Sequence, residues 1–133
     1  MPVRYLLDTN IASYAIKGNI PRVRENLLRV PLPEVGISVV TEAELRFGVL
    51  QSPKPALQQA VEEFLLRVEI LPWDSKAAQT YAALRQTMEH AGSPMGNMDM
   101  MIAAHALAAS LILVTHDRVF HRVKRLRLED WTK

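Results

Sequence analysis

Four acidic residues lie near the ends of predicted strands or the start of predicted helices, in a pattern that could bind a metal ion: Asp8, Glu44, Asp99 and Asp117. Carboxylates held within several ångströms of one another repel, and they raise each other's pKa unless cations intervene. Mg²⁺, or Mn²⁺ in its place, takes oxygen ligands, and such ions can activate a water and stabilise the leaving oxygen of a phosphodiester. The four acids therefore predict a metal-dependent site for phosphodiester hydrolysis.

Each acid also has a purely structural interpretation. The segment Thr41–Glu44 matches a capping box, in which Glu44 only returns a hydrogen bond to the first amide of a helix. Asp99 and Asp117 could each cap a helix or complement its dipole. For these three residues taken singly, capping is the favoured interpretation. Asp8 is harder to explain in this way, because a carboxylate at the inner end of an apolar strand costs stability if it is buried unpaired.

Strands and helices alternate along the chain, which predicts a three-layer α/β fold with helices around a mainly parallel sheet of four to five strands. Strands are expected at 3–7, 35–40, 68–72 and 111–115, with 126–130 as the candidate fifth. Helices are expected at 11–16, 21–29, 41–50 and 56–67, then from Asp74 or Ser75 to 90, from Asp99 onward, and briefly after Asp117. Ligands bind where the carboxyl ends of parallel strands open on one side. Three of the acids lie at such ends, and the fourth could face the same crevice.

Length and composition predict one globular domain over residues 1–133 with a sizeable core, since 49% of the chain is hydrophobic. The chain has no cysteine, which excludes disulfides and thiolate metal sites and suits a cytoplasmic protein. Its first residues lack the layout of a signal peptide. The longest nearly apolar stretch, 100–114, is shorter than the roughly 18 residues of a membrane span. No association with a membrane is expected.

The charge distribution is compatible with a polyanionic partner. The formal net charge is +2. If four of the 14 acids share one site, the rest of the chain carries 16 basic groups and only 10 acidic ones. Such a surface would attract a nucleic acid, although an amphipathic helix and strand edge explain the basic cluster 118–127 equally well. The candidates for contact with a phosphate backbone are Arg46, Arg85 and Arg118, and the sequence does not choose among them.

Several segments in the same order resemble PIN-domain ribonucleases, and specifically the VapC toxins of VapBC toxin–antitoxin pairs. They are "LLDTNIASY", "ISVVTEAELRFGV", "GSPMGNMDMMIAAHA", "LILVTHDRVFHRV" and "LRLEDW". The resemblance covers nearly the whole chain. It implies a PIN-like sandwich, a homodimer, and Mg²⁺-dependent endonuclease activity on RNA, for which tRNA is a common target. A cognate VapB-type antitoxin would block that activity.

The resemblance carries the family's acids onto the four positions already named. Glu44 is matched rather than Glu42, because it precedes the apolar-x-x-Gly segment that ends at Gly48. Asn10 and Thr115 match polar helper positions, with capping as their alternative role. The chain departs from the family at Asn97-Met98, where relatives often have Pro-Phe, and this departure bears on the local loop and on substrate choice.

The implied mechanism places one Mg²⁺ on Asp8, Glu44 and Asp99, with Asp117 aiding it or a second ion. An activated water would attack phosphorus in line and leave 5′-phosphate and 3′-hydroxyl ends. The histidines favour other roles. His105 is interpreted as a packed core residue, and a zinc site at His116 and His121 is disfavoured because these residues do not share a helical face.

The alternative is a non-catalytic α/β binding module of the receiver type. Receivers usually show paired acids after the first strand and a lysine near the last. This chain instead has Asp8-Thr9-Asn10 and no lysine near Thr115. It also lacks a Gly-rich phosphate loop, which disfavours nucleotide-binding enzymes.

Overall fold

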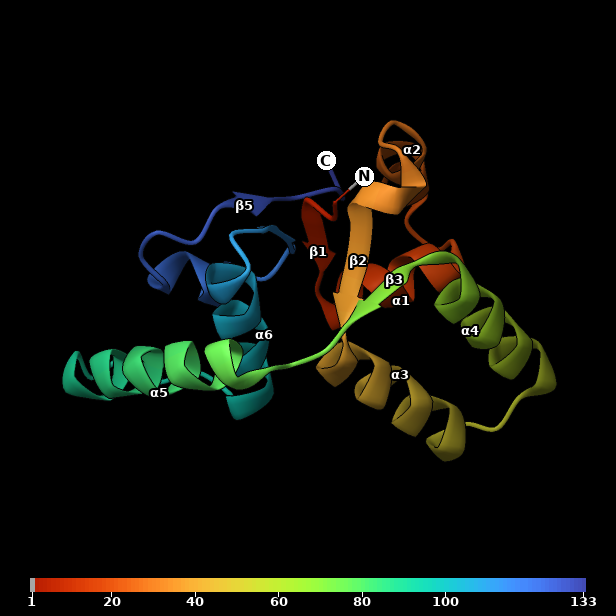
Figure 1. The fold of residues 1–133 in the computed structure, drawn as a ribbon. Helices are drawn as coiled ribbons and strands as arrows, with labels where there is room; N and C mark the ends of the chain where they lie inside the picture. Colours follow the sequence, from red (N-terminus) through yellow and green to blue (C-terminus); the bar gives the residue numbers. More distant parts are fainter. Residues whose placement is uncertain (1) are drawn as a thin grey trace.

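The computed structural model describes residues 2–133, in which helices cover both faces of a parallel sheet (Figure 1). The five strands are β1 (Tyr5–Leu7), β2 (Val35–Ser38), β3 (Glu69–Leu71), β4 (Ile112–Val114) and β5 (Leu128–Glu129). Their order in the sheet is β3-β2-β1-β4-β5, and every neighbouring pair is parallel. The predicted three-layer α/β fold is therefore confirmed, with strands shorter than the sequence pattern indicated.

In the described part of the chain, six α-helices and two 3₁₀ helices connect the strands. They are α1 (Thr9–Lys17), α2 (Pro21–Leu28), α3 (Val39–Gln51), α4 (Pro55–Arg67), α5 (Ser75–His90) and α6 (Asn97–Ala108), with η1 (Leu32–Glu34) and η2 (Arg118–Arg122). Proline occupies the first position of α2 and α4, where its missing N–H costs nothing. Asp74 caps α5 as predicted, because its Oδ1 accepts from the Ala77 N–H at 3.0 Å. Within residues 2–133 no helix has both the length and the apolar character needed to cross a membrane.

The central strands β1, β2 and β4 are buried on both faces of the sheet, which favours a single register. Leu7 and Ile37 pack with α1 and α4 in one apolar cluster, whereas Leu6 and Leu113 pack with α5 and α6 in another. Leu7 pairs with Ile37 of β2 and with Val114 of β4. The three central strands therefore end side by side, and the residues that follow them meet at one edge.

The predicted capping box is wrong. Helix α3 begins at Val39, and Ser38 caps it by accepting the Val40 N–H on its Oγ at 3.1 Å. Thr41 is fully buried inside the helix. The β-branched run 35–40 suggested a longer strand, but β2 ends at Ser38. Glu44 consequently lies in the second turn of α3 and has no capping role.

Two other helix starts differ from the prediction. Helix α1 begins at Thr9 rather than at residue 11, because Asp8 caps it. Helix α6 begins at Asn97 with Gly96 at its N-cap, so Asp99 lies in the first turn but does not cap the helix.

Candidate active site

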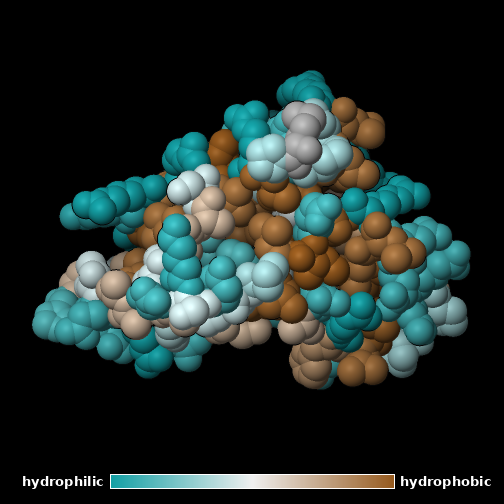
Figure 2. Space-filling view, in the orientation of Figure 1, coloured by the Kyte–Doolittle hydropathy of each residue, from teal (hydrophilic) through white to brown (hydrophobic). Residues whose placement is uncertain are grey.

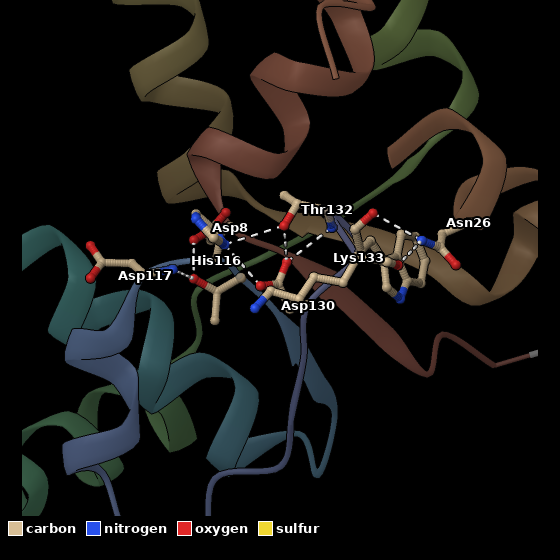
Figure 3. A network of polar contacts seen from close by, with 9 residues as sticks. Asp8, Asn26, His116, Asp117, Asp130, Thr132 and Lys133 are labelled. Atoms are coloured by element: carbon tan, nitrogen blue, oxygen red, sulfur yellow. Dashed lines mark hydrogen bonds and ion pairs between the residues drawn. The ribbon is translucent and has the colours of Figure 1, made fainter. Parts of the chain in front are cut away.

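Asp8 lies at the junction of β1 and α1, and its side chain is almost fully buried, with 4% of the residue exposed. Its Oδ2 accepts the Thr115 hydroxyl at 2.6 Å (Figure 3). Its Oδ1 accepts the Ile11 N–H at 2.8 Å. Asp8 forms no ion pair with a basic side chain in the part of the chain that the structure describes. The site therefore holds a buried carboxyl group whose charge no protein cation balances.

Burial raises the pKa of Asp8 to about 6. The hydrogen bonds from Thr115 and Ile11 oppose this shift, while the negative charges of Asp99 and Asp117 add to it. Because Coulombic repulsion weakens with distance, these contributions locate Asp99 and Asp117 near Asp8.

Asp99 interacts electrostatically with two of the other acids, Asp117 and Glu44. Its side chain is partly buried in the first turn of α6. Burial raises its pKa, and the charges of Asp117 and Glu44 raise it further. Since the pKa of Asp8 responds to Asp99 and Asp117, and that of Asp99 to Asp117 and Glu44, the structure brings the four predicted acids to one region.

Glu44 is oriented by a residue that sequence reasoning missed. The Thr9 hydroxyl donates to Glu44 Oε1 at 2.5 Å and lies 3.3 Å from Thr41 Oγ1. Thr9 directly follows Asp8, and a hydroxyl at the end of an apolar strand was the available signal. Asn10, the predicted helper, is exposed and its side chain forms no hydrogen bond within residues 2–133. Thr9, and not Asn10, thus forms the hydrogen bond to Glu44.

Asp117 both caps a helix and belongs to this cluster. Its Oδ1 accepts the Val119 N–H at 2.9 Å at the start of η2, as capping predicts. Its own N–H donates to Thr115 Oγ1 at 3.0 Å. The Thr115 hydroxyl therefore links the backbone of Asp117 to the carboxylate of Asp8.

The donor set suits a hard divalent cation. All four acids offer carboxylate oxygens, and Asp8 and Asp99 carry the raised pKa values expected of carboxyl groups that lack a counter-charge. In the region covered by the structure, no three histidine, aspartate or glutamate side chains already stand close enough to enclose an ion. Mg²⁺ typically takes one or two carboxylates directly and keeps several waters, so it does not need such an enclosure.

The three candidate arginines have different surroundings. Arg46 pairs with Glu42 at 2.8 Å and with Glu62 at 2.9 Å. Arg85 contacts Glu89 and Tyr81 along α5. The third, Arg118, forms no side-chain hydrogen bond or ion pair with the described residues and lines a cavity that also includes Thr115. Of the three arginines, only Arg118 lacks a side-chain partner among the described residues and shares a cavity with Thr115, which contacts Asp8.

Comparison with known proteins identifies the family. A family model for the PIN domain matches residues 5–126. The chain is 39% identical over 132 residues to the tRNA(fMet)-specific endonuclease VapC of Shigella flexneri, covering 98% of this chain and 99% of that protein. The crystal structure of VapBC2 from Rickettsia felis bound to a promoter DNA fragment superposes with a TM-score of 0.88 at 37% identity, covering 98% of this chain and 99% of that one. DNA-bound VapBC from Salmonella typhimurium gives a TM-score of 0.87 at 33% identity, covering 97% and 98%.

These matches confirm the resemblance read from the sequence motifs, and they support a nuclease over a receiver-like module. The chain belongs to the PIN-domain family and, within it, to the VapC ribonucleases.

Proposed function

We propose that this VapC ribonuclease cleaves RNA with a Mg²⁺ ion held by Asp8, Glu44 and Asp99. Asp117 would assist that ion or a second one that arrives with the substrate. The observation that carries the proposal is the buried Asp8 carboxyl group, which senses the charges of Asp99 and Asp117 and forms no ion pair with a cation among residues 2–133. Mn²⁺ offers the same preference for oxygen ligands and is the expected substitute.

Nucleases with a PIN domain generally depend on a divalent metal, which supplies positive charge at the phosphate and lowers the pKa of an attacking water. The protein's own residues hold the carboxylates in place. Ile11 and Thr115 each donate to one oxygen of Asp8, so the carboxylate is fixed while each oxygen keeps a second lone pair. Thr9 holds Glu44 in the same way. Attack by water leaves 5′-phosphate and 3′-hydroxyl ends without participation of the 2′-hydroxyl.

We infer that tRNA is the first substrate class to test. The Shigella flexneri relative is named for cleavage of tRNA(fMet), and it aligns with nearly the whole chain. Single-stranded loops are the favoured targets within such an RNA, because their phosphates can enter a groove. Arg118 would contact the backbone near the cut, since its guanidinium has no partner among the described residues and it lines a cavity with Thr115, which contacts Asp8.

We also propose a VapB-type antitoxin as partner, because the similar solved structures are VapBC complexes. A groove of about 420 Å³ runs between α1, α3 and α4 from Thr9 and Glu44. Its apolar lining consists of Ile16, Leu45, Val49, Leu57 and Val61. An antitoxin segment in this groove would end at Glu44 and prevent substrate from reaching the acids.

A homodimer is a further part of the proposal. Large apolar side chains are exposed on α3 and α4, with Phe47 at 59%, Leu50 at 78% and Leu66 at 85%. Figure 2 shows hydrophobic surface near the centre of one face, over β3 and the adjoining end of α4. A second copy covering Leu66 would remove this surface from water, so Leu66→Glu should shift the mass measured by light scattering from dimer to monomer.

The activity is tested with purified protein, a tRNA mixture and Mg²⁺. Cleavage is expected with Mg²⁺ or Mn²⁺, and a chelator should stop it. Asp99→Asn should abolish cleavage while leaving the circular dichroism spectrum unchanged, because it removes a ligand charge and relieves repulsion. Full activity in folded Asp99→Asn would contradict the proposed site.

A further inference from the structure

A second polar network lies beside the acids, where β4 and β5 end. His116 Nδ1 lies 2.8 Å from Asp130 Oδ2 and 3.2 Å from Thr132 Oγ1. The Thr132 hydroxyl donates to Asp130 Oδ1 at 2.6 Å, and the Thr132 N–H donates to the same oxygen at 2.9 Å (Figure 3). Two residues of one segment, Asp130 and Thr132, thus hold the imidazole ring of His116, although about half of the His116 side chain is exposed to solvent.

The network fixes which nitrogen of His116 carries a proton. Burial alone would raise the pKa of Asp130, but the hydrogen bonds from Thr132 and His116 outweigh it and hold that pKa below its usual value. Asp130 is therefore an ionised carboxylate that only accepts hydrogen bonds. Because the Thr132 hydroxyl proton is already donated to Oδ1, the bond at Oδ2 takes its proton from His116 Nδ1. In the neutral ring, Nε2 then has a free lone pair and acts as an acceptor.

The imidazole lines a cavity of about 780 Å³, together with Thr115, Arg118, His121 and Asp130. Thr115 also contacts Asp8, so this cavity adjoins the acids. Within the described chain His116 Nε2 has no hydrogen-bond partner, and neither has the Arg118 guanidinium. The cavity therefore offers a cation for a phosphate and, next to it, an acceptor for a hydroxyl.

We propose that His116 is a specificity-determining residue that accepts a hydrogen bond from a ribose 2′-hydroxyl of a nucleotide next to the cleaved bond. The proposal rests on the RNA cleavage proposed above. A phosphate has no proton to donate to Nε2, whereas the 2′-hydroxyl is a donor and is the group that distinguishes RNA from DNA. Arg118 would bind the phosphate of the same nucleotide, and Asp130 acts as a positioning residue because it fixes the proton on Nδ1.

The experiment is a scan of one cleaved oligoribonucleotide, in which each ribose around the cut is replaced singly by 2′-deoxyribose. For the wild-type enzyme, one position should show a loss of kcat/KM of about three- to tenfold, the range for one hydrogen bond. His116→Phe keeps a planar ring without the acceptor, so its kcat/KM with the all-ribose substrate should already be lower by that factor. Replacing the ribose at that position by 2′-deoxyribose should then cause no further loss of kcat/KM.

Two controls separate the possible failures. His90→Phe, at an exposed histidine on α5, should retain the wild-type scan. Asp130→Asn should behave like His116→Phe, because its amide can turn and donate to Nδ1, which moves the ring proton to Nε2. The inference is overturned if His116→Phe keeps the same deoxy sensitivity as the wild-type enzyme or if the wild-type scan is flat. If the wild-type enzyme cleaves no all-ribose substrate, the proposed function itself has failed.

Discussion

The hydroxyl of Thr115 donates to Oδ2 of Asp8 at 2.6 Å, joining two residues that are 107 positions apart in the sequence. The same hydroxyl oxygen accepts the Asp117 N–H at 3.0 Å. One side chain at the end of β4 therefore orients the most buried acid and anchors the loop that carries another.

Removing this hydroxyl should cost both stability and activity. Thr115→Val leaves Asp8 Oδ2 and the Asp117 N–H without their partner, and a lost bond to a buried charged group costs about 1.5–3 kcal/mol. We expect a loss of that size in the free energy of unfolding, measured with urea, together with slower RNA cleavage. Thr115→Ser restores the hydroxyl and should recover most of both quantities, whereas an unstable but fully active Thr115→Val would argue against an orienting role.

The raised pKa of Asp8 predicts a stability that falls as the pH increases. Below its usual pKa of 3.8 this carboxyl is protonated in both the folded and the unfolded chain. Between 3.8 and about 6 the unfolded chain loses the proton first, so ionisation favours unfolding. The resulting decrease in the free energy of unfolding should reach about 3 kcal/mol above pH 6 and then stay constant.

The measurement is urea unfolding between pH 4 and pH 7 in the presence of a chelator. Asp8→Asn cannot ionise, so its free energy of unfolding should fall less over this range than that of the wild-type protein. In the wild-type protein, Mg²⁺ should reduce the fall in the free energy of unfolding between pH 4 and pH 7, because a bound cation stabilises the ionised carboxylate. Parallel pH profiles for the two proteins without metal would contradict the assignment.

His105 should give the opposite pH dependence. Its Nδ1 lies 2.9 Å from Ser38 Oγ in the interior, as expected for a packed core histidine, and burial lowers its pKa from 6.5. Below pH 6.5 the unfolded chain therefore gains a proton more readily than the folded one, so this contribution to stability is lost as the pH falls. His105→Gln should flatten the acid limb of the stability curve, which thermal unfolding at several pH values would reveal.

The sequence predicted the layers of the fold because each strand is a short apolar run and each helix has a recognisable boundary. It also predicted that Asp8 and Asp117 meet, since both follow parallel strands. The exact end of β2 could not be predicted, because Ser38 and Thr41 are both good caps and the β-branched run continues past the strand. Only the register with β1 and the burial of Thr41 decide between them.

Two contacts beside the acids could not be predicted from local sequence patterns. Thr9 reaches Glu44 across 35 positions, and His116 reaches Asp130 across 14. Both contacts depend on which strands become neighbours in the sheet, and the alternation of strands and helices does not specify that order. The sequence therefore indicates the acids and Thr115, whereas the contacts of Thr9 with Glu44 and of His116 with Asp130 emerge only from the fold.

Glu42 and Glu44 provide a matched test of the site within one helix. Glu42 pairs with Arg46 on the surface of α3, whereas Glu44 accepts from Thr9 and contributes to the raised pKa of Asp99. Glu44→Gln keeps the size of the side chain but removes the charge, so cleavage should fall by about 10²-fold or more, as for loss of a group that stabilises the transition state. Glu42→Gln should cost less than about 1 kcal/mol of stability and leave cleavage unchanged, because exposed ion pairs contribute little.

Both variants are compared by initial rates of RNA cleavage at saturating Mg²⁺ after their folding is verified. Equal loss of activity in the two variants would show that α3 supports the fold rather than the chemistry, since only one of the two carboxylates lies among the acids.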